Sequence, residues 1–281
     1  LLKTKIHLRG RHPDDFLDLP QLTDPSIKAQ IDVMTAMASM AYWTSPNLMP
    51  LIVFRLIRIF KTHGNMEYSS YIYAAYGLVL CTLGEIDAGY NYGNMAITLL
   101  DRMNVPKFRS RTLMVVNTFI RHWKEPANNT IAPLQEACRS GMEQGDLEFA
   151  AHSMMVRGNT LYLLATPLDE MHIEFEKNRE SLNRLGQVSN LYVTHIFQQT
   201  VRNLRDKSCE TVKLIGEAYN ETDMLPIHEN ANDQTTLFHL FFNKVVLNYL
   251  FDNYTAAFEA SQRMTALNAG IIGALIYAVS Y

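Results

Sequence analysis

Signals that begin and end α-helices recur along the whole 281-residue sequence. Asp24-Pro25 and Ser45-Pro46 each join a helix-capping residue to a proline that suits the first helical turn. Glycine follows an apolar helical run, as it commonly does at helix C-termini, at Gly64, Gly84, Gly145 and Gly186. No pair of strand-like segments competes with these signals, so the sequence predicts an all-α fold.

The spacing of these signals predicts helices of ordinary length joined by short links. The expected spans are 25–42, 46–63, 67–83, 86–103, 109–123, 131–143, 147–164, 168–185, 189–206, 209–218, 233–251 and 254–268. Short links make successive helices antiparallel, which favours an α-solenoid of helical hairpins. Residues 218–232 break the helical periodicity with proline, asparagine and aspartate, and we expect an irregular loop there.

Two segments carry the spacing of a tetratricopeptide (TPR) hairpin, in which small residues lie where two helices touch. In YGLVLCTLGEIDAGYNYGNMAITLL, Gly77 is expected at the contact in the first helix, Gly84 at the turn, and Gly89 and Ala96 on the inner face of the second helix. The copy KVVLNYLFDNYTAAFEASQRM places Asp252 at the turn, Tyr254 after it and Ala257 where the first copy has Gly89. Its later small position holds Met264, so the repeats are predicted to be degenerate.

The charge balance excludes a strongly basic protein. The chain has 25 Lys and Arg against 28 Asp and Glu, a net charge of −3, which argues against nucleic acid as a partner. Three cysteines far apart in the sequence, at 81, 138 and 209, favour buried reduced thiols in a cytoplasmic protein.

The ends of the chain suggest a segment of a longer protein, because it starts at Leu1 without methionine and finishes on an apolar run. Residues 1–23 are interpreted as a linker from a preceding domain, ending near Pro20, and residues 24–281 as one helical-repeat domain. No signal peptide opens the sequence. The uncharged stretches 68–84 and 264–281 are expected to be buried helices and not membrane spans, the first because its four tyrosine hydroxyls need partners.

Motifs for common chemistry do not occur. None of the 13 glycines is followed by lysine, as a Walker phosphate loop requires, and no GxSxG, HExxH or CxxC is present. The best acid–base or metal candidate is the group His172, Glu174 and Glu176, for which a charged outer face paired with nearby arginines is the alternative interpretation. We therefore assign no catalytic, metal or cofactor-binding residue. An all-helical enzyme around His172 and Glu176 is a weaker hypothesis than a protein-interaction module.

Protein contacts are the better prediction. Arg55, Arg58 and Lys61 recur every three residues on an otherwise apolar helix, and they need carboxylates, solvent or an anionic partner. Either an internal ion-pair network or docking of an acidic surface from a neighbouring domain satisfies this need. Weaker contact candidates lie on the repeat hairpin and at the corner before Pro126: Tyr90, Asn91, Asn94, His122 and Trp123.

Several runs together resemble the helical region that follows the STAND-type predicted ATPase in large multidomain sensor histidine kinases. These runs are NLMPLIVFRLIRIFKTHGN (47–65), YAAYGLVLCTLGEIDAGYNYGNMAITLLDR (73–102), FIRHWKEP (119–126), GDLEFAAHS (145–153), LIGEAYNETDMLP (214–226) and NDQTTLFHLFFNKVVLNYLFDNY (232–254). They extend over about 24–281, in the order that the family has.

The resemblance implies a cytoplasmic, non-catalytic arm that couples an upstream ATPase to a downstream histidine kinase, with the neighbouring domains of the same chain as partners. The parent would be an ATP-dependent protein histidine kinase whose ATP sites lie in those other domains, so no catalytic residue carries over to this numbering. A protein or peptide ligand and dimerisation through the parent are further expectations. The effector arm of a STAND transcription regulator is the alternative.

Overall fold

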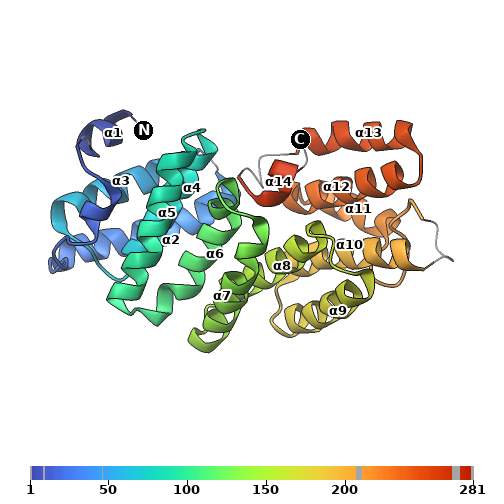
Figure 1. Cartoon of the computed structure of the whole chain (residues 1–281), viewed down its shortest axis with the longest axis horizontal. Coiled ribbons are helices and arrows are strands. Elements are labelled where there is room, and N and C mark those ends of the chain that lie inside the picture. Colours follow the sequence, from blue (N-terminus) through green and yellow to red (C-terminus); the bar gives the residue numbers. More distant parts are fainter. Residues whose placement is uncertain (1, 9, 46, 207–210, 268–272, 280–281) are drawn as a thin grey trace. The chain divides into compact units, whose positions relative to one another are not determined.

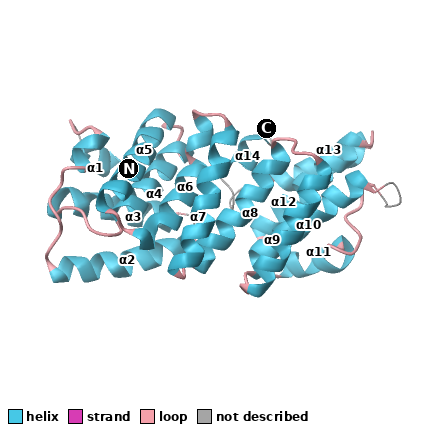
Figure 2. Cartoon of the chain, turned by 60° about the horizontal axis from the view of Figure 1, so that its bottom comes forward, coloured by secondary structure: helices cyan, strands magenta, loops and turns pink. Residues whose placement is uncertain are grey.

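The computed structural model describes residues 2–8, 10–45, 47–206, 211–267 and 273–279, and it divides the chain into two compact units, residues 1–149 and 150–281. Within the described residues the structure is built of helices and contains no β-strand, which confirms the all-α prediction (Figures 1 and 2). Two isolated β-bridges occur, between Gln21 and Asn65 and between Ile215 and Asn220.

Unit 1 consists of consecutive helices that pack as neighbours along the chain (Figure 1). Its α-helices are α1 (Leu2–Leu8), α2 (Pro25–Thr44), α3 (Leu48–His63), α4 (Ser69–Thr82), α5 (Ile86–Met103), α6 (Arg109–Phe119) and α7 (Ile131–Gln144). Short 3₁₀ turns lie between them at Pro13–Phe16, Pro106–Phe108, Arg121–Trp123 and Ala127–Thr130. The division between the units falls within α8 (Leu147–Leu163).

The helices of the α4–α5 hairpin meet at the glycines that the sequence predicted at their contact. A Cβ on Gly77 would lie 2.8 Å from the carbonyl oxygen of Gly89, and a Cβ on Gly89 would lie 2.4 Å from Sγ of Cys81. Gly84 forms the turn with a φ of 82°, and Ala96 is fully buried. The two backbones therefore approach more closely than any side chain at Gly77 or Gly89 would allow.

The segment interpreted as a linker is tied to unit 1 through Asn65. The backbone N–H of Asn65 donates to Pro20 O (2.8 Å), and its side-chain amide donates to Phe16 O (2.6 Å). Tyr73, which is fully buried, donates its hydroxyl to Asn65 Oδ1 at 2.9 Å, and Phe16 packs edge-on against the Tyr73 ring. The core of unit 1 thus holds part of the first 23 residues.

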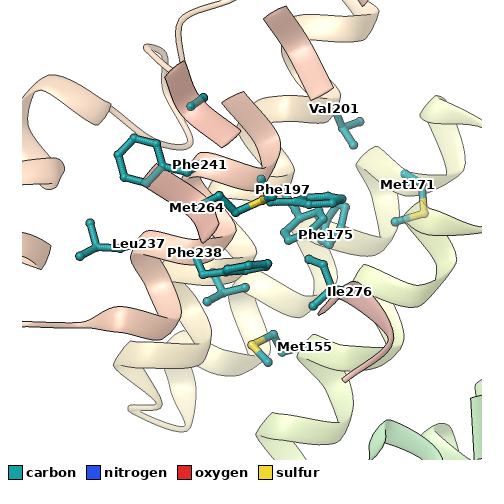
Figure 3. Close-up of a cluster of buried hydrophobic side chains, with 13 residues drawn as sticks. Met155, Met171, Phe175, Phe197, Val201, Leu237, Phe238, Phe241, Met264 and Ile276 are labelled. Carbon is teal, nitrogen blue, oxygen red and sulfur yellow. The ribbon is translucent and has the colours of Figure 1, made fainter. Parts of the chain in front are cut away.

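Unit 2 contains α9 (Leu168–Arg184), α10 (Val188–Arg205), α11 (Glu221–Asn230), α12 (Gln234–Leu250), α13 (Tyr254–Thr265) and α14 (Leu275–Val279). Figure 3 shows its core, in which aromatic and methionine side chains from several helices meet. Phe175, Phe197 and Phe238 are its largest fully buried side chains.

Turns with a left-handed residue follow one helix after another. In addition to Gly84, Gly145 and Gly186, a positive φ occurs just after α5, α8, α11 and α12, at Asn104, Ala165, Asn232 and Asp252. Gly64 also has a positive φ, so all four predicted terminal glycines are confirmed. One left-handed residue ends a helix abruptly and lets the chain reverse within a few residues.

Two predicted helix boundaries differ from the structure, one at Ser45 and one in the helix predicted over 109–123. The Asp24 cap is confirmed, since Asp24 Oδ1 accepts the N–H of Ser26 at 2.8 Å. Ser45 instead ends α2, and α3 begins only at Leu48, while Pro46 lies outside the described residues. The predicted helix 109–123 ends at Phe119, after which residues 121–123 form a 3₁₀ turn.

The region 209–232 is the clearest correction to the sequence analysis. Residues 211–218, predicted as a helix, form turns and bends, and residues 207–210 lie outside the described residues. The predicted loop 218–232 holds helix α11, with Pro226 inside it. Side-chain hydrogen bonds hold the first part in place, because Gln199 Oε1 accepts the N–H of Ala218 at 3.1 Å and Asn203 donates to Lys213 O at 2.6 Å.

Candidate functional site

The basic residues of α3 differ in exposure. Arg55 is exposed, Arg58 and Lys61 are half-buried, and none of the three forms an ion pair with an acid in the described ranges of the chain. Leu48 (40% exposed) and Leu51 (61%) precede Arg55 on the same helix at intervals of three and four residues. These side chains share one face of α3, because such intervals return to the same side of a helix.

Lys61 is used inside unit 1. Its ammonium group donates to the carbonyl oxygen of His7, near the C-terminus of α1, where free carbonyls favour a cation. Burial, and then the nearby charges of Lys61 and Arg58, lower the pKa of His7. Arg55 is therefore the member of the predicted basic group that is most open to a partner, with Arg58 beside it.

The α5 candidates form part of a polar cluster. Tyr90 donates its hydroxyl to Glu125 Oε1 at 2.8 Å, whereas Asn91 is exposed and Asn94 is half-buried. Burial alone would raise the pKa of Glu125, but hydrogen bonds from Asn129 and Tyr90 and the charge of Arg121 lower it. Tyr90 thus positions the chain after α6, and Asn91 is the more accessible contact candidate.

The His122-Trp123 corner is largely packed. Trp123 donates its indole N–H to Phe119 O at 3.1 Å. The rings of His122 and Trp123 lie with their centroids 5.0 Å apart. Burial lowers the pKa of His122 to about 4, and neither ring nitrogen has a hydrogen-bond partner among the described residues. His122 is therefore neutral in the folded unit near pH 7.

The acid–base candidates of α9 are engaged in ion pairs. Glu174 pairs with Arg157, and Glu176 accepts from Arg179 at 3.0 Å and from Arg202 at 3.1 Å. His172 is half-buried, and its Nδ1 has no hydrogen-bond partner among the described residues. The charged-face interpretation describes these contacts, although the partner arginines come from α8 and α10 as well as from α9.

The α12–α13 hairpin has an exposed apolar surface that was not predicted from the sequence. At the turn between α12 and α13, five large apolar side chains are between 41% and 63% exposed: Tyr249, Leu250, Phe251, Tyr254 and Phe258. Their helical spacing resembles that of core residues, so aromatic periodicity alone could not find them. The run Tyr249-Leu250-Phe251 at the very end of a helix, beside a turn, was the available signal.

The described residues contain no group of three His, Cys, Asp or Glu side chains arranged to hold a metal ion. None of their helices is both long and apolar enough to cross a membrane. Cys81 is buried, which raises the pKa of its thiol to about 12, Cys138 is half-buried, and Cys209 lies outside the described residues.

Comparison with known proteins adds no assignment, because neither the family models nor the curated proteins include a match to this sequence.

Proposed function

We propose that the chain is a non-catalytic interaction module, a solenoid of degenerate TPR-like hairpins that couples a STAND ATPase to a histidine kinase in one cytoplasmic signalling protein. The signalling context rests on the resemblance of the six sequence runs. Two structural features support the proposal of hairpins. The helices of α4–α5 meet at glycines, and a residue with a positive φ follows many of the helices. A stack of such hairpins offers a large side-chain surface to partners.

The observation that carries the contact role is the face of α3. It presents Leu48 and Leu51 next to Arg55 and Arg58, and the two arginines lack an acidic partner within the described residues. Arginine beside apolar surface is a frequent combination at protein interfaces, where it binds carboxylates with defined geometry. The partner in this proposal is an acidic surface of the neighbouring ATPase domain.

The test is the affinity of the chain for that ATPase domain, measured by titration calorimetry. Reversing both charges, with Arg55→Glu and Arg58→Glu, should weaken binding at least tenfold and leave the helical circular dichroism signal unchanged. Arg11→Glu is the matched control, because Arg11 is an exposed cation of the same unit. Equal affinity of the double variant and the control would refute the role of α3.

A further inference from the structure

The α12–α13 turn carries an exposed aromatic row. Tyr249 and Tyr254 lie with ring centroids 5.7 Å apart at an interplanar angle of 65°, and Phe258 is one helical turn beyond Tyr254 on α13. Figure 1 shows this turn at the end of the hairpin away from α14. Together with Leu250 and Phe251 these residues form what we call the aromatic turn, with on the order of 500 Å² of exposed apolar surface. Apolar patches of a few hundred Å² on a single chain are often functional.

The charges around the aromatic turn are acidic. Asp252 and Glu259 are exposed, and neither forms an ion pair with a cation in the described part of the chain. Asp252 Oδ1 accepts the hydroxyl hydrogen of Tyr254 at 2.6 Å, which fixes a carboxylate beside the tyrosine rings.

The cations of the same two helices are already bound elsewhere. Lys244 on α12 donates to Glu221 at 2.7 Å, and Arg263 on α13 pairs with Glu229 and lies over the Phe241 ring at 4.2 Å. Both carboxylates belong to α11. Among the described residues, the aromatic turn therefore combines apolar surface with negative charge that no cation pairs.

From this combination we infer that the aromatic turn binds an amphipathic helix of a partner protein that presents arginine or lysine beside leucine-like side chains. The cation would lie against the faces of Tyr249 and Tyr254 and near Asp252, since aromatic faces and carboxylates both attract cations. The apolar side of the partner helix would cover Leu250, Phe251 and Phe258. This surface is opposite in charge to the α3 face, and the inference stands whether or not the ATPase docks there.

A second copy of this chain fits the aromatic turn less well. Two copies meeting there would bring Asp252 and Glu259 close to the same acids of the other copy, and like charges at an interface are unfavourable.

The experiment uses the whole chain and a designed 18-residue helical peptide with leucine on one face and arginine along its edges. A peptide in which glutamate replaces each arginine is the partner control. We expect fluorescence anisotropy to show binding of the arginine peptide only, weakened about tenfold by Phe258→Ser and about fivefold by Asp252→Asn. Asparagine keeps both the left-handed turn and an acceptor for Tyr254, so the second variant removes charge alone.

Matched variants on α9 control for non-specific attraction. Ile173 is 54% exposed, and Glu180 is an exposed acid that forms no ion pair within the described residues. Ile173→Ser and Glu180→Gln should leave the affinity unchanged. Equal weakening by these controls, equal binding of both peptides, or no binding at all would overturn the inference. So would sedimentation of the chain as a dimer that Phe258→Ser dissociates, because the occupant would then be a second copy.

Discussion

The hairpins α4–α5 and α12–α13 share a similar sequence spacing of small residues but pack differently. In α4–α5 of unit 1, glycine at 77 and 89 lets the backbones touch, and nearly every residue of α4 is buried. In α12–α13 of unit 2, Ala257 stands where the first hairpin has Gly89, and α13 leaves Tyr254 and Phe258 more than half exposed. The first helix of the α4–α5 hairpin is thus almost fully enclosed, whereas the second helix of the α12–α13 hairpin has an open aromatic face.

The difference suggests separate roles for the two hairpins. A helix that is buried on all sides contributes to stability and has no surface left for a partner. An exposed apolar face lowers the solubility of a protein. Such a face is therefore often a binding surface that a partner covers. Substitutions in the α4–α5 contact should therefore affect unfolding, and substitutions on the exposed face of α13 should affect binding.

The largest effect is expected at the closest helix contact. Gly89→Val should lower the free energy of unfolding by about 3 kcal/mol, because a Cβ there would lie 2.4 Å from Cys81 Sγ and 2.7 Å from Gly77 O. Ala257→Val is the comparison, at the matching position of the second hairpin. Urea unfolding followed by circular dichroism measures both. Equal losses would mean that the two hairpins are packed alike.

A pH effect of intermediate size is expected from the buried histidine of α12. Burial lowers the pKa of His239 to about 4, and the unfolded chain binds a proton near pH 6.5. Stability from the neutral histidine is therefore present above pH 6.5 and is lost as the pH falls from there towards 4. The loss between pH 7 and pH 5 should be about 2 kcal/mol.

The variant His239→Asn isolates this contribution. Asparagine can keep the hydrogen bond to Thr235 O, which His239 Nδ1 makes at 2.8 Å, and it does not titrate. Urea unfolding at both pH values should show a smaller pH-dependent loss in the variant. Thr236→Ser, a buried polar change on the same helix, should retain the full loss. An unchanged pH dependence in His239→Asn would contradict the prediction.

A smaller effect is expected where Asn65 joins the first residues to unit 1. Tyr73→Phe removes the hydroxyl that donates to Asn65 Oδ1 in the core and should cost about 1 kcal/mol. Tyr254→Phe removes an exposed hydroxyl that donates to Asp252, and surface changes of this kind fall within about 0.5 kcal/mol. Thermal unfolding of the two variants side by side gives the comparison, and similar values would show that the Asn65 network contributes little.

Local signals predicted the all-α class and many of the helix ends. Asp24, Gly84 and Gly145 each act within a few residues of their own position, through a capping bond or a left-handed turn, so the helix ends they mark were predictable. Gly77 and Gly89 were also predictable, since their spacing within one hairpin determines which helix faces meet.

Contacts between distant residues account for the errors. Proline inside a helix normally predicts a break, yet α11 includes Pro226. The first turn of α11 is held from a distance, because Lys244 of α12 binds Glu221. Residues 211–218 have a helical pattern but bond to Gln199 and Asn203 of α10. Among the candidate contacts, the spacing of Arg55, Arg58 and Lys61 placed them on one helix but could not show that Lys61 binds the carbonyl of His7.

The smallest effect on stability is expected at Phe258. Its side chain is 63% exposed, so Phe258→Ser should change the free energy of unfolding by less than about 0.5 kcal/mol. Phe238→Ser, on α12 and about 1% exposed, would leave a large cavity and cost several-fold more. Urea unfolding of the two variants measures the contrast. A loss above about 1 kcal/mol at Phe258 would mean that this ring is covered by the chain itself, because an exposed side chain has few contacts to lose. Unit 2 would then be as closed as unit 1, and the aromatic turn would have no free surface for a partner helix.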